Sequence, residues 1–172
     1  MPISITSNQQ QDVDSNIQVN DADVTGANPV PVVLTGDAWT PLLISEETAN
    51  DSDKSFTVPA NRQYQYLSVW VELISDANVG DRQITIEIQD AAADVIGQVR
   101  AGIVQAASLT RNYLFSPPLA DLLGFRDTNY LMTPLPMIVL PATYILRVYD
   151  SAAIAAATDD MVVQIMVAQR TV

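Results

Sequence analysis

The sequence contains no cysteine and no histidine. Without cysteine, the chain has no disulfide, no thiolate metal site and no cysteine nucleophile. Without histidine, it lacks the usual general base, the commonest transition-metal ligand and the side chain that titrates near neutral pH. A hydrolytic triad that contains histidine is therefore excluded. We expect a protein that is not an enzyme and that holds no cofactor.

Positive charge and long apolar runs are also scarce. The 172 residues include 20 acidic and 8 basic side chains, which gives a formal net charge of −12. A phosphate backbone is repelled by such a surface, so nucleic acid is not an expected partner. No apolar run approaches the roughly 20 residues that span a bilayer, and the start MPISITSNQQ lacks the features of a signal peptide. We expect a soluble protein made in a cytoplasm, with no membrane partner.

Residues 1–53 differ in composition from the rest of the chain. They carry nine acidic residues and no lysine or arginine, and their apolar residues are isolated. Such spacing offers too little apolar area to build a core, and Pro29 and Pro31 favour extended backbone. Two interpretations stay open, a mobile tail and an extended acidic arm that orders on neighbouring subunits; the regular spacing favours the arm slightly. The candidate contact residues of the arm are Ile3, Ile5, Val13, Ile17, Val19, Val32 and Trp39.

The most informative stretch is residues 62–74, RQYQYLSVWVELI. Its apolar residues alternate with a period of two, which predicts a long β-strand. One face carries the aliphatic row Leu67, Val69, Val71 and Leu73, suited to a core. The opposite face is too aromatic for a plain solvated surface and too polar for a sealed interior. That face presents Tyr64, Tyr66, Ser68, Trp70, Glu72 and Ile74.

From residue 54 onwards the chain shows short strand patterns separated by turn signals. Strands are predicted at residues 83–89, 112–115, 143–150 and 161–168, and one or two helical turns at 119–125. The alanines of residues 90–107 would allow a helix, but Gly97 and Gly102 weaken it, so we predict a hairpin. The segment Trp39–Ile44 is expected to be the first to dock on the core. The fold class is all-β: an antiparallel β-sandwich of jelly-roll type over residues 54–172, preceded by the extended N-terminal arm of residues 1–53.

Several residues suggest chemistry, and each also has a simpler interpretation. The run Asp12-Val-Asp14-Ser-Asn16 starts like a calcium-binding loop, but Ile17 stands where glycine is required, so solvated acidic loops are favoured. Glu72 and Glu87 would have to flank one sugar to act as a glycosidase pair, and no motif supports them. An aromatic platform of Trp70, Tyr64 and Tyr66 could stack on a sugar, although packing beneath the arm or a loop is favoured.

Protein contact is the role we expect for the aromatic face. Its candidate residues are Tyr64, Tyr66, Trp70, Ile145 and Tyr149, the last two only if their strand is adjacent. Arginines suit such contacts because the guanidinium pairs with a carboxylate through two hydrogen bonds. The candidate anchors are Arg62, Arg82 and Arg147; ordinary surface solubility is an equal alternative for each of them.

About two-thirds of the chain, residues 58–168, resembles small virion proteins of tailed bacteriophages. The segments that carry the resemblance are VPANRQYQYLSVWVEL, GDRQITIEIQDAAADVIGQVRAG, SLTRNYLFSPPLADLLGFRDTNYLMTPLP, LPATYILRVYDSAAI and DDMVVQIMVA. Several members of that group are jelly-roll cement (decoration) proteins. The resemblance is one of overall texture and not of a catalytic signature.

The resemblance implies a structural protein of the virion. As a capsid cement protein, the chain would bind the major capsid protein on the outer surface of the phage head as homotrimers, stabilise the shell, and be synthesised in the cytoplasm of the bacterial host. Two alternatives stay open: a head–tail connector, tail or baseplate component, and a carbohydrate-binding β-sandwich module.

Overall fold

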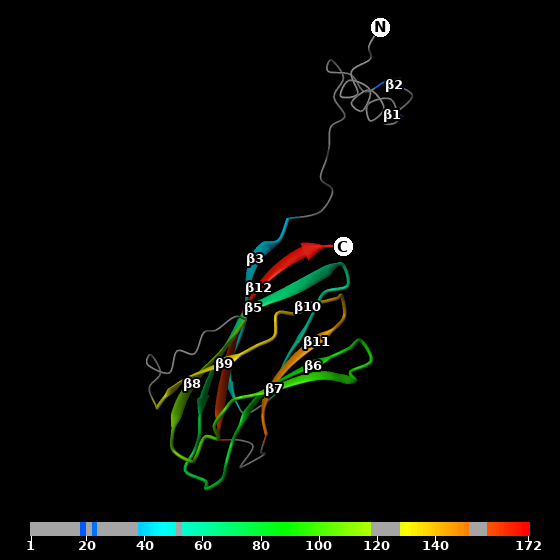
Figure 1. Cartoon of the computed structure of the whole chain (residues 1–172). Coiled ribbons are helices and arrows are strands. Elements are labelled where there is room, and N and C mark those ends of the chain that lie inside the picture. Colours follow the sequence, from blue (N-terminus) through cyan, green and yellow to red (C-terminus); the bar gives the residue numbers. More distant parts are fainter. Residues whose placement is uncertain (1–17, 20–21, 24–37, 51–52, 118–127, 152–157) are drawn as a thin grey trace, which may run out of the picture. The chain divides into compact units, whose positions relative to one another are not determined.

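The computed structural model describes residues 18–19, 22–23, 38–50, 53–117, 128–151 and 158–172 (Figure 1). The chain divides into two compact units, Met1–Gly36 and Asp37–Val172. In the first unit, β1 (Gln18–Val19) pairs with β2 (Ala22–Asp23) in an antiparallel ladder. The second unit is all-β, and no helix occurs in the residues just named.

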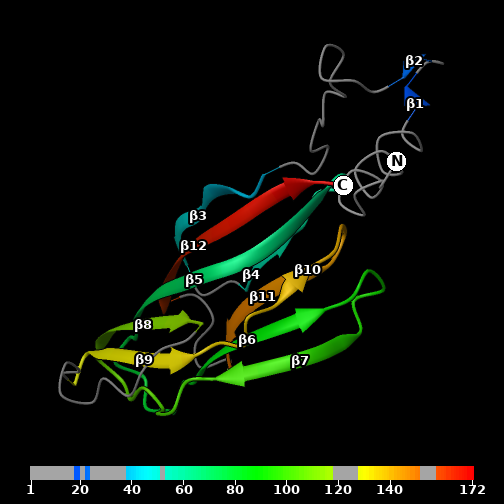
Figure 2. The same ribbon diagram turned by 45° about the horizontal axis from the view of Figure 1, so that its top comes forward.

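The second unit is a sandwich of two sheets, visible as two layers in Figures 1 and 2. We call them the large sheet, with the order β3-β12-β5-β8-β9 and β10 paired to β5, and the small sheet, with the order β4-β11-β6-β7. The large sheet comprises β3 (Thr40–Asn50), β5 (Arg62–Ile74), β8 (Thr110–Ser116), β9 (Tyr130–Pro134), β10 (Val139–Leu140) and β12 (Asp160–Thr171). The small sheet comprises β4 (Lys54–Thr57), β6 (Ile84–Gln89), β7 (Val95–Arg100) and β11 (Ile145–Asp150).

The strand order identifies the fold as a jelly roll. When β9 and β10 are set aside, eight main strands remain, and along the chain they fall in the orders 1-8-3-6 and 2-7-4-5 in the two sheets. These orders are those of a double-sheet jelly roll built from Greek keys. The sequence-based prediction of an antiparallel jelly-roll sandwich is confirmed, with one exception: β8 and β9 are parallel. Residues 117–129 separate them, about the dozen residues that a parallel crossover requires.

The predicted strands are found close to their expected positions. The strand over residues 62–74 is β5, and the strand expected at 83–89 is β6, with Ile84, Ile86 and Ile88 buried in the core. The hairpin expected within residues 90–107 is formed by β6 and β7. The helical turns expected at 119–125 fall within residues 118–127, outside the described part of the chain.

The sandwich begins earlier than residue 54. Strand β3 lies within the stretch expected to be the arm, yet it pairs with β12 along its length, from Thr40 opposite Gln169 to Asn50 opposite Met161. Its inner residues Leu42 and Ile44 pack against the core. These two inward apolar residues explain the docking on the core that was expected for Trp39–Ile44. The sandwich therefore begins at about Asp37.

A β-bulge in β5 changes the phase of this strand. Ser68 lies opposite Met166 of β12 and Tyr66 lies opposite Val167, so Leu67 is an extra residue on β5. A bulge of one residue exchanges the inner and outer faces of the strand beyond it. Tyr66 and Tyr64 are therefore buried together with Val69, Val71 and Leu73, whereas Leu67 is 39% exposed. The expectation that Leu67 belongs to the core row and the two tyrosines to the opposite face is wrong for this reason.

Candidate functional site

The outer face of the large sheet carries the aromatic site that the structure leaves accessible. Trp70 of β5 lies opposite Leu114 of β8, which in turn lies opposite Met132 of β9. Together with Asn112, Tyr130 and Leu131, these residues line a hollow of about 340 Å³. Tyr130 is 56% exposed. We call this site the Trp70 hollow.

The predicted interface face is not one surface. Trp70 is on the outer side of the large sheet, but Tyr64 and Tyr66 are in the core beyond the bulge. Ile145 and Tyr149 belong to β11, which pairs with β4 and β6 in the small sheet and not with β5. The five candidates therefore lie in three places: the outer face of the large sheet, the core and the small sheet. The bulge and the strand order cause this division, and the alternation of apolar residues in the sequence reveals neither of them.

Leu114, Met132 and Tyr130 were not among the residues singled out from the sequence. A signal for Leu114 exists in TRNYLFS (residues 110–116), where Tyr113 and Phe115 are buried on one side and Leu114 is apolar on the other. A strand that is apolar on both sides covers the core with one face and offers the other to a partner. Met132 and Tyr130 could not be placed, because the parallel pairing of β9 has no local signal.

The outer face of the small sheet is polar and its side chains bind one another. Arg147 Nε donates a hydrogen bond to Asp53 Oδ2 at 2.9 Å, and Arg147 Nη1 donates to Glu87 Oε1 at 3.3 Å. Tyr149 also donates to Glu87, through its hydroxyl at 3.1 Å, and the Arg147 guanidinium lies 4.3 Å from the centre of the Tyr149 ring. Arg147 was expected to anchor a partner, but here it pairs with carboxylates of its own chain.

Glu87 is ionised within this network although it is buried, with only 5% of the residue exposed. Burial alone raises the pKa of a carboxyl group. Hydrogen bonds from Gln89, Tyr149 and Arg147, with the positive charge of Arg147, outweigh that effect, so the net pKa of Glu87 is lowered. The network therefore holds a carboxylate, and not a protonated acid of the kind that general acid catalysis requires.

Arg82 is buried and cannot anchor an exposed contact. Its guanidinium donates to Asp159 through Nε and through Nη2, the latter at 3.0 Å from Oδ1, and Nη2 also lies 2.7 Å from Asp76 Oδ1. These interactions connect the segment between β5 and β6 to the start of β12. The carboxylate pairing expected for Arg82 exists, but it is internal to the fold.

Arg62 and Trp39 both lie beside the end of β12. Arg62 Nη1 donates to the Thr171 hydroxyl at 2.7 Å. Trp39 is partly buried, and its ring lies 4.8 Å from the guanidinium carbon of Arg170. Of the other arm residues, Val19 is in β1 opposite Ala22. The remaining ones lie outside the described residues: Ile3, Ile5, Val13, Ile17 and Val32.

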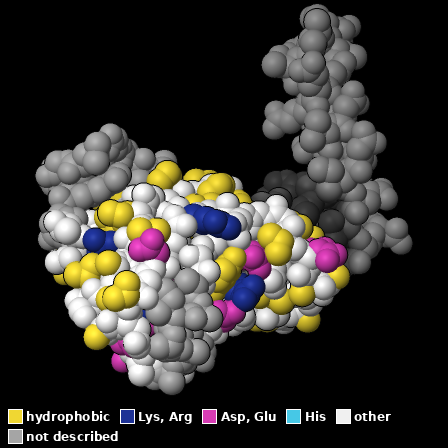
Figure 3. All heavy atoms as spheres, turned by 90° about the horizontal axis from the view of Figure 1, so that it is seen from below, with side chains coloured by type: hydrophobic (Ala, Val, Ile, Leu, Met, Phe, Trp, Pro, Cys, Tyr) yellow, Lys and Arg dark blue, Asp and Glu magenta, His cyan; other side chains and the backbone are white. Residues whose placement is uncertain are grey.

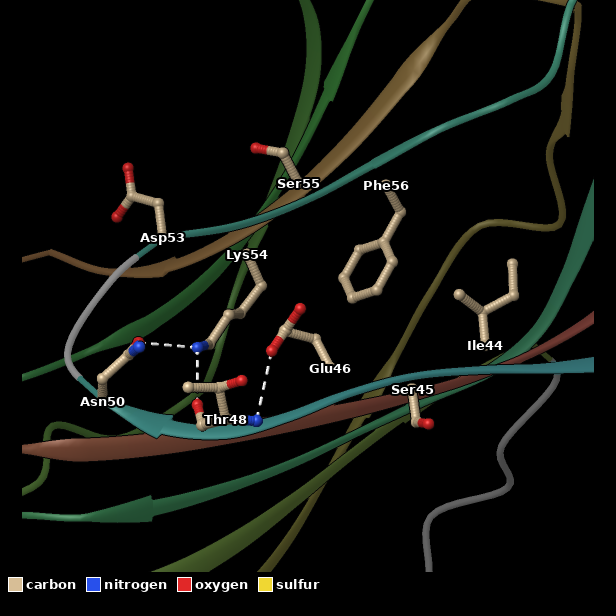
Figure 4. Close-up of a pocket in the computed structure, with 9 residues that line it drawn as sticks. All are labelled: Ile44, Ser45, Glu46, Thr48, Asn50, Asp53, Lys54, Ser55 and Phe56. Atoms are coloured by element: carbon tan, nitrogen blue, oxygen red, sulfur yellow. Dashed lines mark hydrogen bonds between the residues drawn. The ribbon is translucent and has the colours of Figure 1, made fainter.

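A second hollow, of about 530 Å³, opens between β3 and β4. Figure 4 shows Ile44 of β3 and Phe56 of β4 pointing into it from the two strands. Lys54, the single lysine of the chain, lines it although it is only 4% exposed. Its ammonium group donates to Thr48 O at 2.8 Å and to Asn50 Oδ1 at 2.7 Å. The lysine therefore joins the two sheet edges, a role that the sequence did not indicate.

No catalytic or metal-binding arrangement is found in the part of the chain that the structure describes. Glu72 of β5 and Glu87 of β6 lie on the outer faces of different sheets and cannot flank one substrate. No group of three or more potential metal ligands occurs among these residues; Asp12 and Asp14 lie outside them. The described residues also contain no helix that is long and apolar enough to cross a membrane.

Comparisons with known proteins find similarity among solved structures alone. No protein-family model and no curated protein matches the sequence. Among solved structures, a chain of turnip yellow mosaic virus aligns over 90% of its own length and 90% of this chain, with 14% sequence identity and a TM-score of 0.36. The strand order described above, and not this similarity, defines the fold.

Proposed function

We propose that this chain is a non-enzymatic structural protein of a tailed-phage virion, a cement protein that binds the outer surface of the head. The observation that carries the proposal is a jelly roll whose large sheet presents an accessible apolar outer face around Trp70. Exposed aromatic and methionine side chains in an uncharged setting are typical of protein interfaces. The resemblance of residues 58–168 to small phage virion proteins supports the same assignment.

The mechanism is binding of an assembled lattice. A protein that binds neighbouring copies of the major capsid protein only when they are assembled stabilises that assembly by mass action. The two packed sheets supply a rigid body for this purpose, and copies of the chain act as trimers on the shell. Residues 1–36, which form a separate unit, extend the footprint to neighbouring subunits.

The test is binding to heads that lack the protein. The purified full-length chain is mixed with such heads, expanded and unexpanded, and the heads are sedimented. Saturable co-sedimentation with expanded heads at a stoichiometry fixed by the lattice supports the proposal. Binding to isolated tails or connectors in place of heads would favour the alternative of a connector, tail or baseplate component.

Carbohydrate binding is a second candidate function because of one observation. Trp70 lines an accessible hollow on a sheet face, where an aromatic ring can stack on a sugar. Glycan-array binding by the wild-type chain that is lost in Trp70→Ala would favour this function. Binding to heads that survives Trp70→Ala, with no glycan bound, would exclude it.

A further inference from the structure

We infer that the Trp70 hollow and the sheet face around it are the contact between copies of this chain. The inference deepens the proposed function, because it names the surface through which the proposed oligomer forms. It does not depend on capsid binding, since self-association is measured with the purified chain alone.

The face is wide and uncharged at its centre. Gln164 of β12 lies opposite both Trp70 and Ser45, and Met166 lies opposite both Leu43 and Ser68, so these outward residues form two rows across the sheet. None of the described side chains in these two rows is charged; they are Leu43, Ser45, Ser68, Trp70, Leu114, Met132, Gln164 and Met166. Charge begins in the next row, where Glu72 lies opposite Asn112, and continues at Asp160 beyond it. Arg170 carries the charge at the other end of the face.

The absence of charge is what selects a second copy as the occupant. Each copy has a formal net charge of −12, so two copies repel one another wherever their acidic surfaces meet. Contact through the two uncharged rows avoids that cost and leaves burial of apolar surface as the driving force. The small sheet has the opposite character, with Arg147, Asp53 and Glu87 on its outer side, and would suit a partner recognised through charge.

The composition of the hollow argues against a small ligand. A ligand pocket usually places several polar groups to fix the orientation of its ligand. Here Trp70, Leu114 and Met132 dominate, and only Asn112 and Tyr130 of the lining residues have a side-chain amide or hydroxyl group. Exposed Tyr130 and Met166, at 56% and 39%, are instead the adaptable apolar contacts that protein interfaces favour.

The experiment measures the molar mass of the full chain in solution by sedimentation over a wide range of concentrations. The wild-type chain is expected to exceed the 18.7 kDa of the monomer, and Leu114→Glu is expected to shift the association midpoint at least tenfold in concentration. Ile145→Glu is the matched control: it places the same charge at a partly buried apolar position on the outer face of the small sheet. It is expected to leave association unchanged.

A second variant guards against misfolding. Tyr130→Glu charges the rim of the hollow at an exposed position and is expected to weaken association with an unchanged melting temperature. A wild-type chain that stays monomeric at all concentrations overturns the inference, and so does an oligomer that Leu114→Glu and Tyr130→Glu leave intact. If the chain is monomeric but loses head binding in these variants, the face contacts the capsid and the proposed function survives without this inference.

Discussion

Arg82 and Asp159, 77 positions apart in the sequence, form a buried ion pair in which two guanidinium nitrogens each donate to a carboxylate oxygen. Both side chains are fully buried, and Arg82 makes a further ion pair with Asp76 at 2.7 Å. Neighbouring carbonyls accept from the same guanidinium, Asn78 O at 3.3 Å and Gly80 O at 3.2 Å. The cluster thus closes the end of the sandwich where β5, β6 and β12 meet.

Removing one partner of this pair should strongly destabilise the fold. Arg82→Met leaves the Asp159 carboxylate buried without its cation, which typically costs about 3–5 kcal/mol. Urea unfolding measures the loss. Arg100→Met, at an exposed position of β7, is the control and should change the unfolding free energy by less than about 0.5 kcal/mol. Equal effects of the two substitutions would contradict the burial of Arg82.

The bulge in β5 predicts how much stability is lost when neighbouring residues are substituted. Tyr66→Ala removes a core side chain and should cost about 3–5 kcal/mol, whereas Leu67→Ala should cost less than about 1 kcal/mol because Leu67 is exposed. The Tyr66 hydroxyl is buried and has no hydrogen-bond partner in the described part of the chain. Tyr66→Phe should therefore be neutral or stabilising. Thermal unfolding of the three variants checks the ranking, and a larger loss for Leu67→Ala than for Tyr66→Ala would place the strand in the other phase.

The positions of the strands, and in most of them the face that is buried, were predictable from the sequence. The sites were not. A period of two is a local signal, so QITIEIQ over residues 83–89 was assigned correctly as a strand with its isoleucines inward. A bulge at Leu67 adds one residue with no local signal. The ion pair of Arg82 with Asp159 and the row from Trp70 to Met132 depend on which strands become neighbours, which a single sequence does not specify.

Glu87 predicts a pH dependence of stability. Its pKa is lowered from 4.5 in the folded state, where hydrogen bonds and Arg147 outweigh the opposing effect of burial. The carboxylate therefore stabilises the fold above about pH 4.5, and this contribution is lost as the pH falls through the lower folded-state pKa. The difference in unfolding free energy between wild type and Glu87→Gln should be largest near neutral pH and shrink in acid.

The control for this measurement is Glu72→Gln, a partly exposed glutamate on the outer face of β5. Its difference from wild type should be small, because the side chain is partly exposed. A difference for Glu87→Gln that does not change between neutral and acidic pH would mean that the carboxylate is not stabilised by its neighbours.

The burial of Lys54 predicts that this side chain resists amine modification. An amine-reactive ester at neutral pH should label the α-amino group of the polypeptide while Lys54, 4% exposed and donating to Thr48 and Asn50, stays unmodified until urea unfolds the chain. Peptide mass spectrometry reads out both sites. Rapid labelling of Lys54 in the folded chain would show that the edge between β3 and β4 opens in solution.

The measurement that tests the proposed function most directly is the thermal disruption midpoint of phage heads with and without this protein. Heads that lack the protein are saturated with the purified full-length chain, and DNA release is followed on heating and on addition of a chelator. The cement role predicts a higher disruption temperature and slower DNA release. A protein that binds only the assembled lattice stabilises that lattice. Saturated heads that release their DNA at the same temperature and rate as bare heads would contradict it.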